Sequence, residues 1–299
     1  MSAEFSFTTA GDHIVNWSVF SPDGAVDSNL SGSIQIPVQP SQVISIEIES
    51  VEIADEGIDI AWAVDLSEGR ERLVILDFGV IQDSLGQSMG TAIPNRALML
   101  VCGGIGSGKS IIGQRMSFGM TANDVRVSLF TTELTTRGWL EQVSSLGYYM
   151  DKRIDEGSFH LISSFGVIAE PAEEEVTILD ILESPASKEA EVVIIDRASE
   201  LMPEEMSGKE LLRLLRKFTS EGRTLILTID PDEMDGDALR DMKNSAEIVL
   251  DMMTAVVGGQ MVRTVGVTRF LRAAGPVTER IGWKVMPEMG FIVDITAVA

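Results

Sequence analysis

Basic side chains are missing from the first part of this chain. Residues 1–69 contain no Lys or Arg, although they contain twelve Asp and Glu residues. The whole chain of 299 residues has a formal net charge of −23. Because a protein needs a positively charged surface to bind the phosphate backbone of a nucleic acid, this charge argues against a nucleic-acid-binding protein.

Cysteine, histidine and long apolar runs are also scarce. Cys102 is the single cysteine, so the chain cannot form an internal disulfide, which is typical of a reducing compartment. His13 and His160 have no Cys or His companion at the spacing of zinc ligands. No apolar run approaches the roughly 20 residues that span a bilayer, and the N-terminus lacks the pattern of a secretion signal. We therefore expect a cytoplasmic protein without a membrane span.

The distribution of charge and of apolar residues predicts two domains. In residues 1–80, segments such as "QVISIEIESVEI" alternate apolar and polar residues, which is typical of half-buried strands. We expect a small, acidic, antiparallel all-β domain there, to which no function can be assigned. In residues 81–299, apolar strands alternate with amphipathic helices. That alternation predicts an α/β domain whose mostly parallel sheet is covered by helices on both faces.

A glycine-rich segment in the second domain matches the phosphate-loop pattern G-x-x-x-x-G-K-[ST]. Its residues are Gly103, Gly104, Ile105, Gly106, Ser107, Gly108, Lys109 and Ser110. The segment follows an apolar strand and opens a helix with Ile111, as a phosphate loop must, because its backbone N–H groups and the helix N-terminus bind the anion together. We expect Lys109 to contact the outer phosphates of ATP and Ser110 to bind Mg²⁺.

Two carboxylates are candidates for the rest of this site. Asp196 ends the apolar strand "EVVIID" and suits the position that holds the magnesium shell. Many ATPases have a Glu directly after that Asp, whereas this chain has Arg197, and Glu200 is too far along the loop. We therefore expect Glu133, at the end of "LFTTE", to orient the attacking water.

Basic residues gather near the C-terminus of this acidic chain. From Thr254 to Lys284 there are five basic residues and one acid, Glu279. Oligomeric ATPases often complete each site with a basic side chain from the neighbouring subunit. Arg269 and Arg272 are the candidates for such a trans-acting role, and ordinary pairing with the acidic surface is the alternative.

Several segments follow one another as they do in the RecA/KaiC-like ATPases. They are "GGIGSGKSIIGQRMSFG", "TTELTTRGWLEQVSSLG", "VVIID", "TLILTIDP" and "GFIVD". The chain resembles this family over residues 83–299, and within it the accessory ATP-binding proteins of the archaellum, the archaeal swimming motor. The resemblance implies a RecA-like fold and a homo-oligomeric ring. It also implies a position beneath the membrane, where ATP binding regulates contact with the archaellum motor ATPase and the membrane platform protein, with weak or absent hydrolysis.

The chain departs from that family at two positions. Arg197 stands where Ser is common, and Asp230 stands where His is common before the proline of "TIDP". Both changes put γ-phosphate sensing and hydrolysis in doubt and leave ATP binding intact. Two other functions stay open: a KaiC-like regulatory ATPase outside motility, and a RecA-type recombinase, which the negative charge disfavours.

Overall fold

The structure is a computed structural model that describes residues 85–294 apart from 91, 168–175, 204–205 and 258–259. Before residue 85 it describes the backbone of six strands. The chain divides into two compact units, Met1–Arg72 and Leu73–Ala299. Among the described residues, no helix combines the length and the apolar character needed to cross a membrane.

The first unit consists of antiparallel strand pairs. Its strands are β1 (Ser2–Ser6), β2 (Gly11–Phe20), β3 (Val26–Val38), β4 (Val43–Ala54) and β5 (Gly57–Ser67). β1, β4 and β5 form one sheet and β2 pairs with β3, in each case antiparallel. The predicted domain boundary at residue 80 lies outside the described residues, and the acidic all-β domain remains a prediction.

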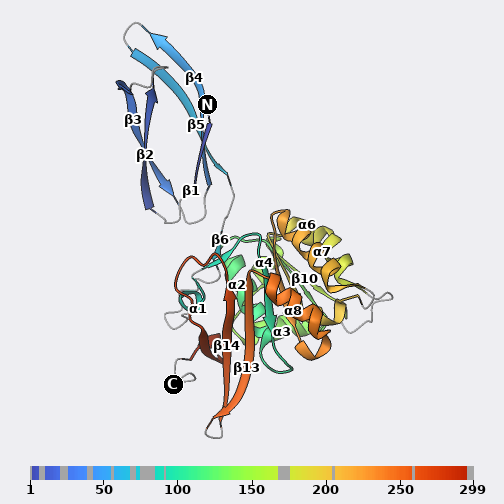
Figure 1. Cartoon of the computed structure of the whole chain (residues 1–299). Helices are drawn as coiled ribbons and strands as arrows, with labels where there is room; N and C mark the ends of the chain where they lie inside the picture. The colour runs from blue at the N-terminus through green and yellow to red at the C-terminus, as the bar shows by residue number, and fades with distance from the viewer. Residues whose placement is uncertain are drawn as a thin grey trace. The chain divides into compact units, whose positions relative to one another are not determined.

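The second unit is built around one large sheet (Figure 1). Its strands are β8 (Leu98–Cys102), β9 (Val127–Thr131), β10 (Phe159–Ser163), β11 (Val192–Asp196), β12 (Thr224–Ile229), β13 (Ile248–Val257), β14 (Gln260–Phe270), β15 (Arg280–Met286) and β16 (Gly290–Val293). In the described part of the chain they lie in the order β10-β9-β11-β12-β8-β13-β14-β15-β16. The strands from β10 to β13 in this order pair in parallel, and those from β13 to β16 pair antiparallel. A short strand pair, β6 (Arg72–Val74) and β7 (Ala92–Pro94), precedes this sheet in the chain.

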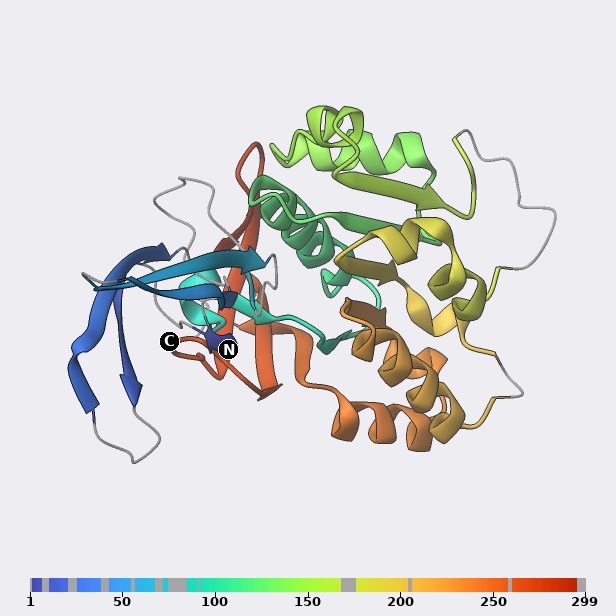
Figure 2. The ribbon, with the colours of Figure 1, turned by 90° about the horizontal axis from the view of Figure 1, so that it is seen from above.

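Helices connect the parallel strands, except for the first helix, which precedes the sheet in the chain. They are α1 (Leu85–Ser88), α2 (Lys109–Ala122), α3 (Thr136–Ser145), α4 (Asp151–Asp155), α5 (Ile178–Glu183), α6 (Pro185–Glu189), α7 (Gly208–Ser220) and α8 (Gly236–Ser245), with single 3₁₀ turns η1 (Ala198–Leu201) and η2 (Pro231–Glu233). α2 and α3, in green, and α7 and α8, in yellow to orange, lie on opposite sides of the sheet (Figure 1, Figure 2).

The central strands are apolar throughout because both faces of the sheet are covered. In β8, Met99 and Val101 pack in the core beneath α2 and α3, whereas the alternate residues Leu98 and Leu100 pack beneath α5, α7 and α8. Every residue of β8, β9, β11 and β12 is buried. The prediction of a mostly parallel sheet with helices on both faces is confirmed. Its parallel strands end at one edge, which is where ligands bind in open α/β sheets.

Candidate nucleotide site at the carboxyl ends of the strands

The glycine-rich loop joins β8 to α2 and is attached to the next strand of the sheet. Gly103 N donates to the carbonyl oxygen of Ile229, the last residue of β12, at 3.0 Å. At its tip, Gly104 to Gly106 are exposed, and the side chain of Ile105 is 96% exposed. Ser107 Oγ is buried without a hydrogen-bond partner among the described residues. Ile111 is half-buried, and its side chain packs against the apolar core. Only its backbone therefore faces the phosphate loop.

Gly108 closes the loop in a conformation that other residues rarely adopt. It is the N-cap of α2, with φ of 95° and ψ of 18°. A Cβ atom built on Gly108 would lie 2.2 Å from Cη2 of Trp283 in β15, a buried residue whose ring stacks on Phe291 at 4.5 Å. The turn and the packing beneath it therefore both require glycine here.

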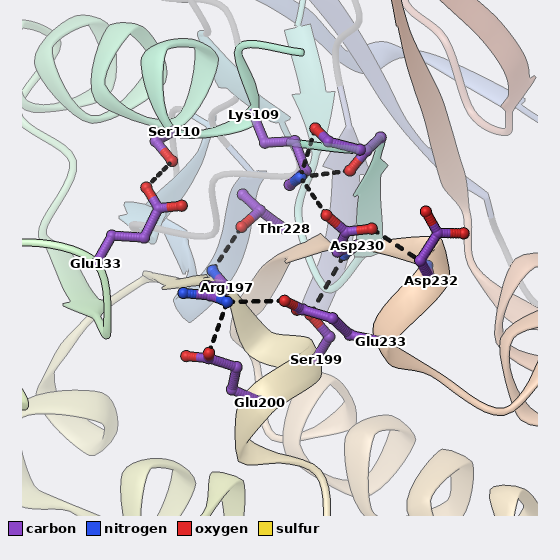
Figure 3. A network of polar contacts seen from close by, with 12 residues as sticks. Lys109, Ser110, Glu133, Arg197, Ser199, Glu200, Thr228, Asp230, Asp232 and Glu233 are labelled. Atoms are coloured by element: carbon purple, nitrogen blue, oxygen red, sulfur yellow. Dashed lines mark hydrogen bonds and ion pairs between the residues drawn. The ribbon is translucent and has the colours of Figure 1, made fainter. Parts of the chain in front are cut away.

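The hydroxyl of Ser110 contacts both candidate carboxylates. Ser110 Oγ donates to Glu133 Oε2 at 2.9 Å and lies 3.0 Å from Asp196 Oδ1. Glu133 follows β9 and Asp196 ends β11, and these strands are neighbours in the sheet. The ends of two adjacent parallel strands and the start of α2 thus bring together three residues that lie far apart in the sequence, and Figure 3 shows the contact of Ser110 with Glu133. A hydroxyl with two carboxylates is a set of hard oxygen ligands, the kind that Mg²⁺ prefers.

Asp196 is almost completely buried beneath this contact. Thr228 Oγ1, on the neighbouring strand β12, donates to Asp196 Oδ1 at 2.8 Å. Burial raises the pKa of Asp196 to about 6, and the negative charge of Glu133 adds to the rise. Hydrogen bonds from Thr228 and Ser110 lower this pKa and offset part of the effect of burial.

Lys109 is buried and uses its ammonium group within the loop. Lys109 Nζ donates to the carbonyl oxygens of Gly103 and of Gly104, the latter at 3.0 Å. It also lies 3.5 Å from Asp230 Oδ2, in an ion pair whose two side chains are both under one-tenth exposed. Asp230 directly follows β12, so the position that departs from the family pattern faces the lysine of the loop.

Arg197 is held by carboxylates at the same edge of the sheet. Its Nη2 lies 2.7 Å from Glu200 Oε1 and 2.8 Å from Glu233 Oε1 (Figure 3). The backbone of Arg197 has φ of 61°, and its N–H donates to Thr228 Oγ1 at 2.6 Å. Glu200, which sequence spacing places too far along the loop for catalysis, pairs with Arg197 and accepts a hydrogen bond from Thr132.

The two candidate trans-acting arginines lie away from the loop of their own chain. Arg269 pairs in β14 with Val249, near the amino end of β13, and its Nε is buried without a hydrogen-bond partner among the described residues. Arg272 donates to the carbonyl oxygens of Asn95 and Arg96, just before β8 begins. The loop follows the opposite end of β8, so neither arginine contributes to its own chain's site.

Sequence reasoning missed three residues of the site. Thr228 hydrogen bonds to Asp196, Trp283 packs beneath Gly108, and Glu233 pairs with Arg197. The position of Thr228 near the end of an apolar strand is a signal that could have identified it, as it did Asp196. Trp283 and Glu233 carry no such signal, because their roles arise from contacts between distant segments.

Comparisons with known proteins agree with the fold. A family model described as "ATPase: KaiC" matches residues 81–281. The archaeal flagellar ATP-binding protein FlaH of Methanocaldococcus jannaschii is 26% identical over 221 residues, which cover 73% of this chain and 95% of that protein. FlaH of Sulfolobus acidocaldarius is 23% identical over 217 residues, covering 70% of this chain and 92% of that protein.

A solved structure gives the same result. The crystal structure of the flagellar accessory protein FlaH from M. jannaschii superposes with a TM-score of 0.67 at 25% sequence identity. The match covers 75% of this chain and 99% of that one. The chain therefore belongs to the KaiC family of P-loop ATPases and is FlaH-like in both sequence and fold.

Proposed function

We propose that this chain is an ATP-binding accessory protein of the archaellum, which binds ATP with Mg²⁺ and hydrolyses it slowly at most. The observation that carries the proposal is the contact of Ser110 with both Glu133 and Asp196, next to a loop whose lysine is buried. The FlaH name of its relatives supports the assignment to the archaellum.

Each residue of the site has a role in this proposal. The loop from Gly103 to Gly108 would bind the phosphates through its backbone, and Lys109 would contact the outer ones. Ser110 and Asp196 would hold Mg²⁺, which neutralises charge on those phosphates. Glu133 would orient water, and bound ATP would supply the phosphoanhydride bond.

Slow hydrolysis is proposed because the site has a single candidate for the water-orienting carboxylate. The residue after Asp196 is Arg197, and its guanidinium pairs with Glu200 and Glu233. Glu133 is exposed and hydrogen-bonded to Ser110. A site of this composition suits a protein that responds to bound ATP. It is less suited to a protein that hydrolyses ATP rapidly.

Isothermal titration calorimetry of the full chain with ATP and Mg²⁺ tests the binding step. Lys109→Ala is expected to reduce ATP affinity at least about 100-fold, because the ammonium group is the buried cation of the loop. Lys188→Ala, which removes an exposed lysine of α6, is the matched control and should leave affinity unchanged. Equal affinity of the Lys109 variant and the unmodified chain would remove the basis of the assignment.

The regulatory role is tested by co-purification with the archaellum motor ATPase and its membrane platform protein. We expect retention of the motor ATPase to change on adding ATP, and Lys109→Ala to abolish that change. Retention that is indifferent to nucleotide would contradict the switch. If the motor ATPase were not retained at all, the KaiC-like regulatory ATPase outside motility, which the family match fits equally well, would be the better assignment.

A further inference from the structure

Asp230 places a buried negative charge beside the lysine that would bind the phosphates. The side chains of Asp230 and Lys109 are 6% and 9% exposed, and Asp230 Oδ2 lies 3.5 Å from Lys109 Nζ. A phosphate-binding site is expected to present positive or neutral groups to its anion. The function proposed above gives this carboxylate no role.

All three donors of the Lys109 ammonium group already have acceptors. They are the carbonyl oxygens of Gly103 and Gly104 and the carboxylate of Asp230. A lysine ammonium group has three N–H donors and no more. A phosphate oxygen that binds Lys109 must therefore replace one of these acceptors or share the ammonium group with them.

The carboxylate of Asp230 is fixed in its position by the turn that follows β12. Its Oδ1 accepts a hydrogen bond from Asp232 N at 3.2 Å, and its own N–H donates to Ser199 Oγ at 3.3 Å. Ser199 Oγ in turn donates to Glu233 Oε2 at 2.7 Å. The backbone contact holds the residue in place, and moving the carboxylate away from Lys109 would break its hydrogen bond with Asp232 N.

We propose that Asp230 determines the nucleotide preference of the loop, by lowering the affinity for a triphosphate more than the affinity for a diphosphate. The proposal rests on the proposed function, since it assumes that the loop binds nucleotide. If the phosphates share Lys109 with Asp230, two like charges lie next to one ammonium group. If they displace Asp230, a buried carboxylate loses its cation. Both effects weaken binding, and the repulsion grows with each negative charge on the ligand.

A positioning role for Asp230 makes the opposite prediction. If Asp230 served to orient Lys109 toward the phosphates, removing its charge would weaken the binding of ADP and ATP alike. If Asp230 discriminates by charge, its removal strengthens the binding of ATP and changes the binding of ADP less. The ratio of the two affinities therefore distinguishes the two roles.

The test is calorimetric titration of the full chain with ADP and with ATP, each with Mg²⁺. Asp230→Asn keeps the shape of the side chain and its acceptor for Asp232 N while removing the charge. We expect ATP affinity to rise about tenfold and ADP affinity to rise no more than about threefold. Asp232→Asn is the matched control, because it removes the same charge from an exposed residue two positions away. It should leave the ratio unchanged, since an exposed charge is screened by solvent.

Several outcomes would overturn the proposal. They are a loss of affinity for both nucleotides in Asp230→Asn, an unchanged ratio, or an equal change of the ratio in the Asp232 variant. Failure of the unmodified chain to bind either nucleotide would instead contradict the proposed function, so the two failures are distinguishable.

Discussion

Asp196 shows how a single residue of the site reduces the stability of the fold. Its carboxylate is 4% exposed and lies beside Glu133, and its pKa is raised to about 6 from 3.8. Between these two pH values the folded chain holds a proton that the unfolded chain has released. The free energy of unfolding therefore falls as the pH rises from about 4 to about 6, and above that range the charged form is held at a cost.

Asp196→Asn should therefore stabilise the chain in the absence of ligand at neutral pH. The amide keeps an acceptor for Thr228 and Ser110 without carrying a buried charge. We expect a higher melting temperature than that of the unmodified chain at pH 7.5, and a smaller difference at pH 5.0, where Asp196 is mostly protonated. Thermal unfolding followed by circular dichroism at the two pH values measures this. A lower melting temperature of the variant at pH 7.5 would contradict the electrostatic account.

Glu133→Gln separates binding from turnover at the same site. The amide retains an acceptor for the hydroxyl of Ser110, which now donates to Glu133 at 2.9 Å, but an amide is a far weaker base than a carboxylate. We expect ATP affinity within about threefold of the unmodified chain and complete loss of any slow hydrolysis. Calorimetry and phosphate release measure the two quantities. Turnover at the original rate would show that Glu133 does not orient the attacking water.

At the scale of elements, the phosphate loop depends on the strands β15 and β16, which pack beneath it. Gly108 needs its positive φ, and the ring of Trp283 leaves no room for a Cβ atom. Gly104 belongs to the same pattern, yet a Cβ atom built there meets no atom within 4 Å. The backbone and the packing thus require glycine at position 108 and leave room for a side chain at position 104, so a matched pair of variants can separate the two cases.

Gly108→Ala is expected to destabilise the chain by about 2 kcal/mol or more, because it combines backbone strain with overpacking against a buried ring. Gly104→Ala should change the free energy of unfolding by less than about 1 kcal/mol, since its side chain would point into open space. Urea unfolding of both variants measures the difference. Equal stability of the two would show that Trp283 can move away from Gly108.

Several elements of the second unit have a strong local pattern in the sequence. The strands β8, β9, β11 and β12 are continuous apolar runs, and α7 begins at a capping box formed by Ser207 and Glu210. α8 lacks such a pattern, because few of its residues are apolar and Met242 is its one buried residue. Its position depends on packing against α7 and the sheet rather than on its own sequence.

At the scale of the whole molecule, the roles of Arg269 and Arg272 depend on whether the chain forms a ring. Arg272 already binds two backbone carbonyl groups of its own chain, whereas Arg269 Nε has no hydrogen-bond partner in the described part of the chain. Because that Nε atom is buried, a contact with a neighbouring subunit would have to use the rest of the Arg269 guanidinium, which, among the described residues, no hydrogen bond to a backbone carbonyl group holds as it holds Arg272.

Arg269→Ala should leave ATP binding by the single chain unchanged and weaken any ATP-dependent oligomer. Arg213→Ala, which removes an exposed arginine from α7, is the control and should behave as the unmodified chain. Size-exclusion chromatography with light scattering, with and without ATP and Mg²⁺, measures the oligomer. If the Arg269 variant assembled as the unmodified chain does, a trans-acting role for this residue would be wrong.

The sequence was sufficient to predict the mostly parallel sheet with helices on both faces, and it proposed the phosphate loop with Asp196 and Glu133 at the ends of neighbouring strands. Each rests on a local pattern, in which an apolar strand sets the direction of the chain and the residue at its end lies at a known edge of the sheet. The tertiary structure decided what surrounds those residues: Trp283 beneath Gly108, Glu233 beside Arg197 and Asp230 against Lys109. These contacts join segments that are distant along the chain, so their geometry depends on how the strands and turns pack and not on any pattern within one segment.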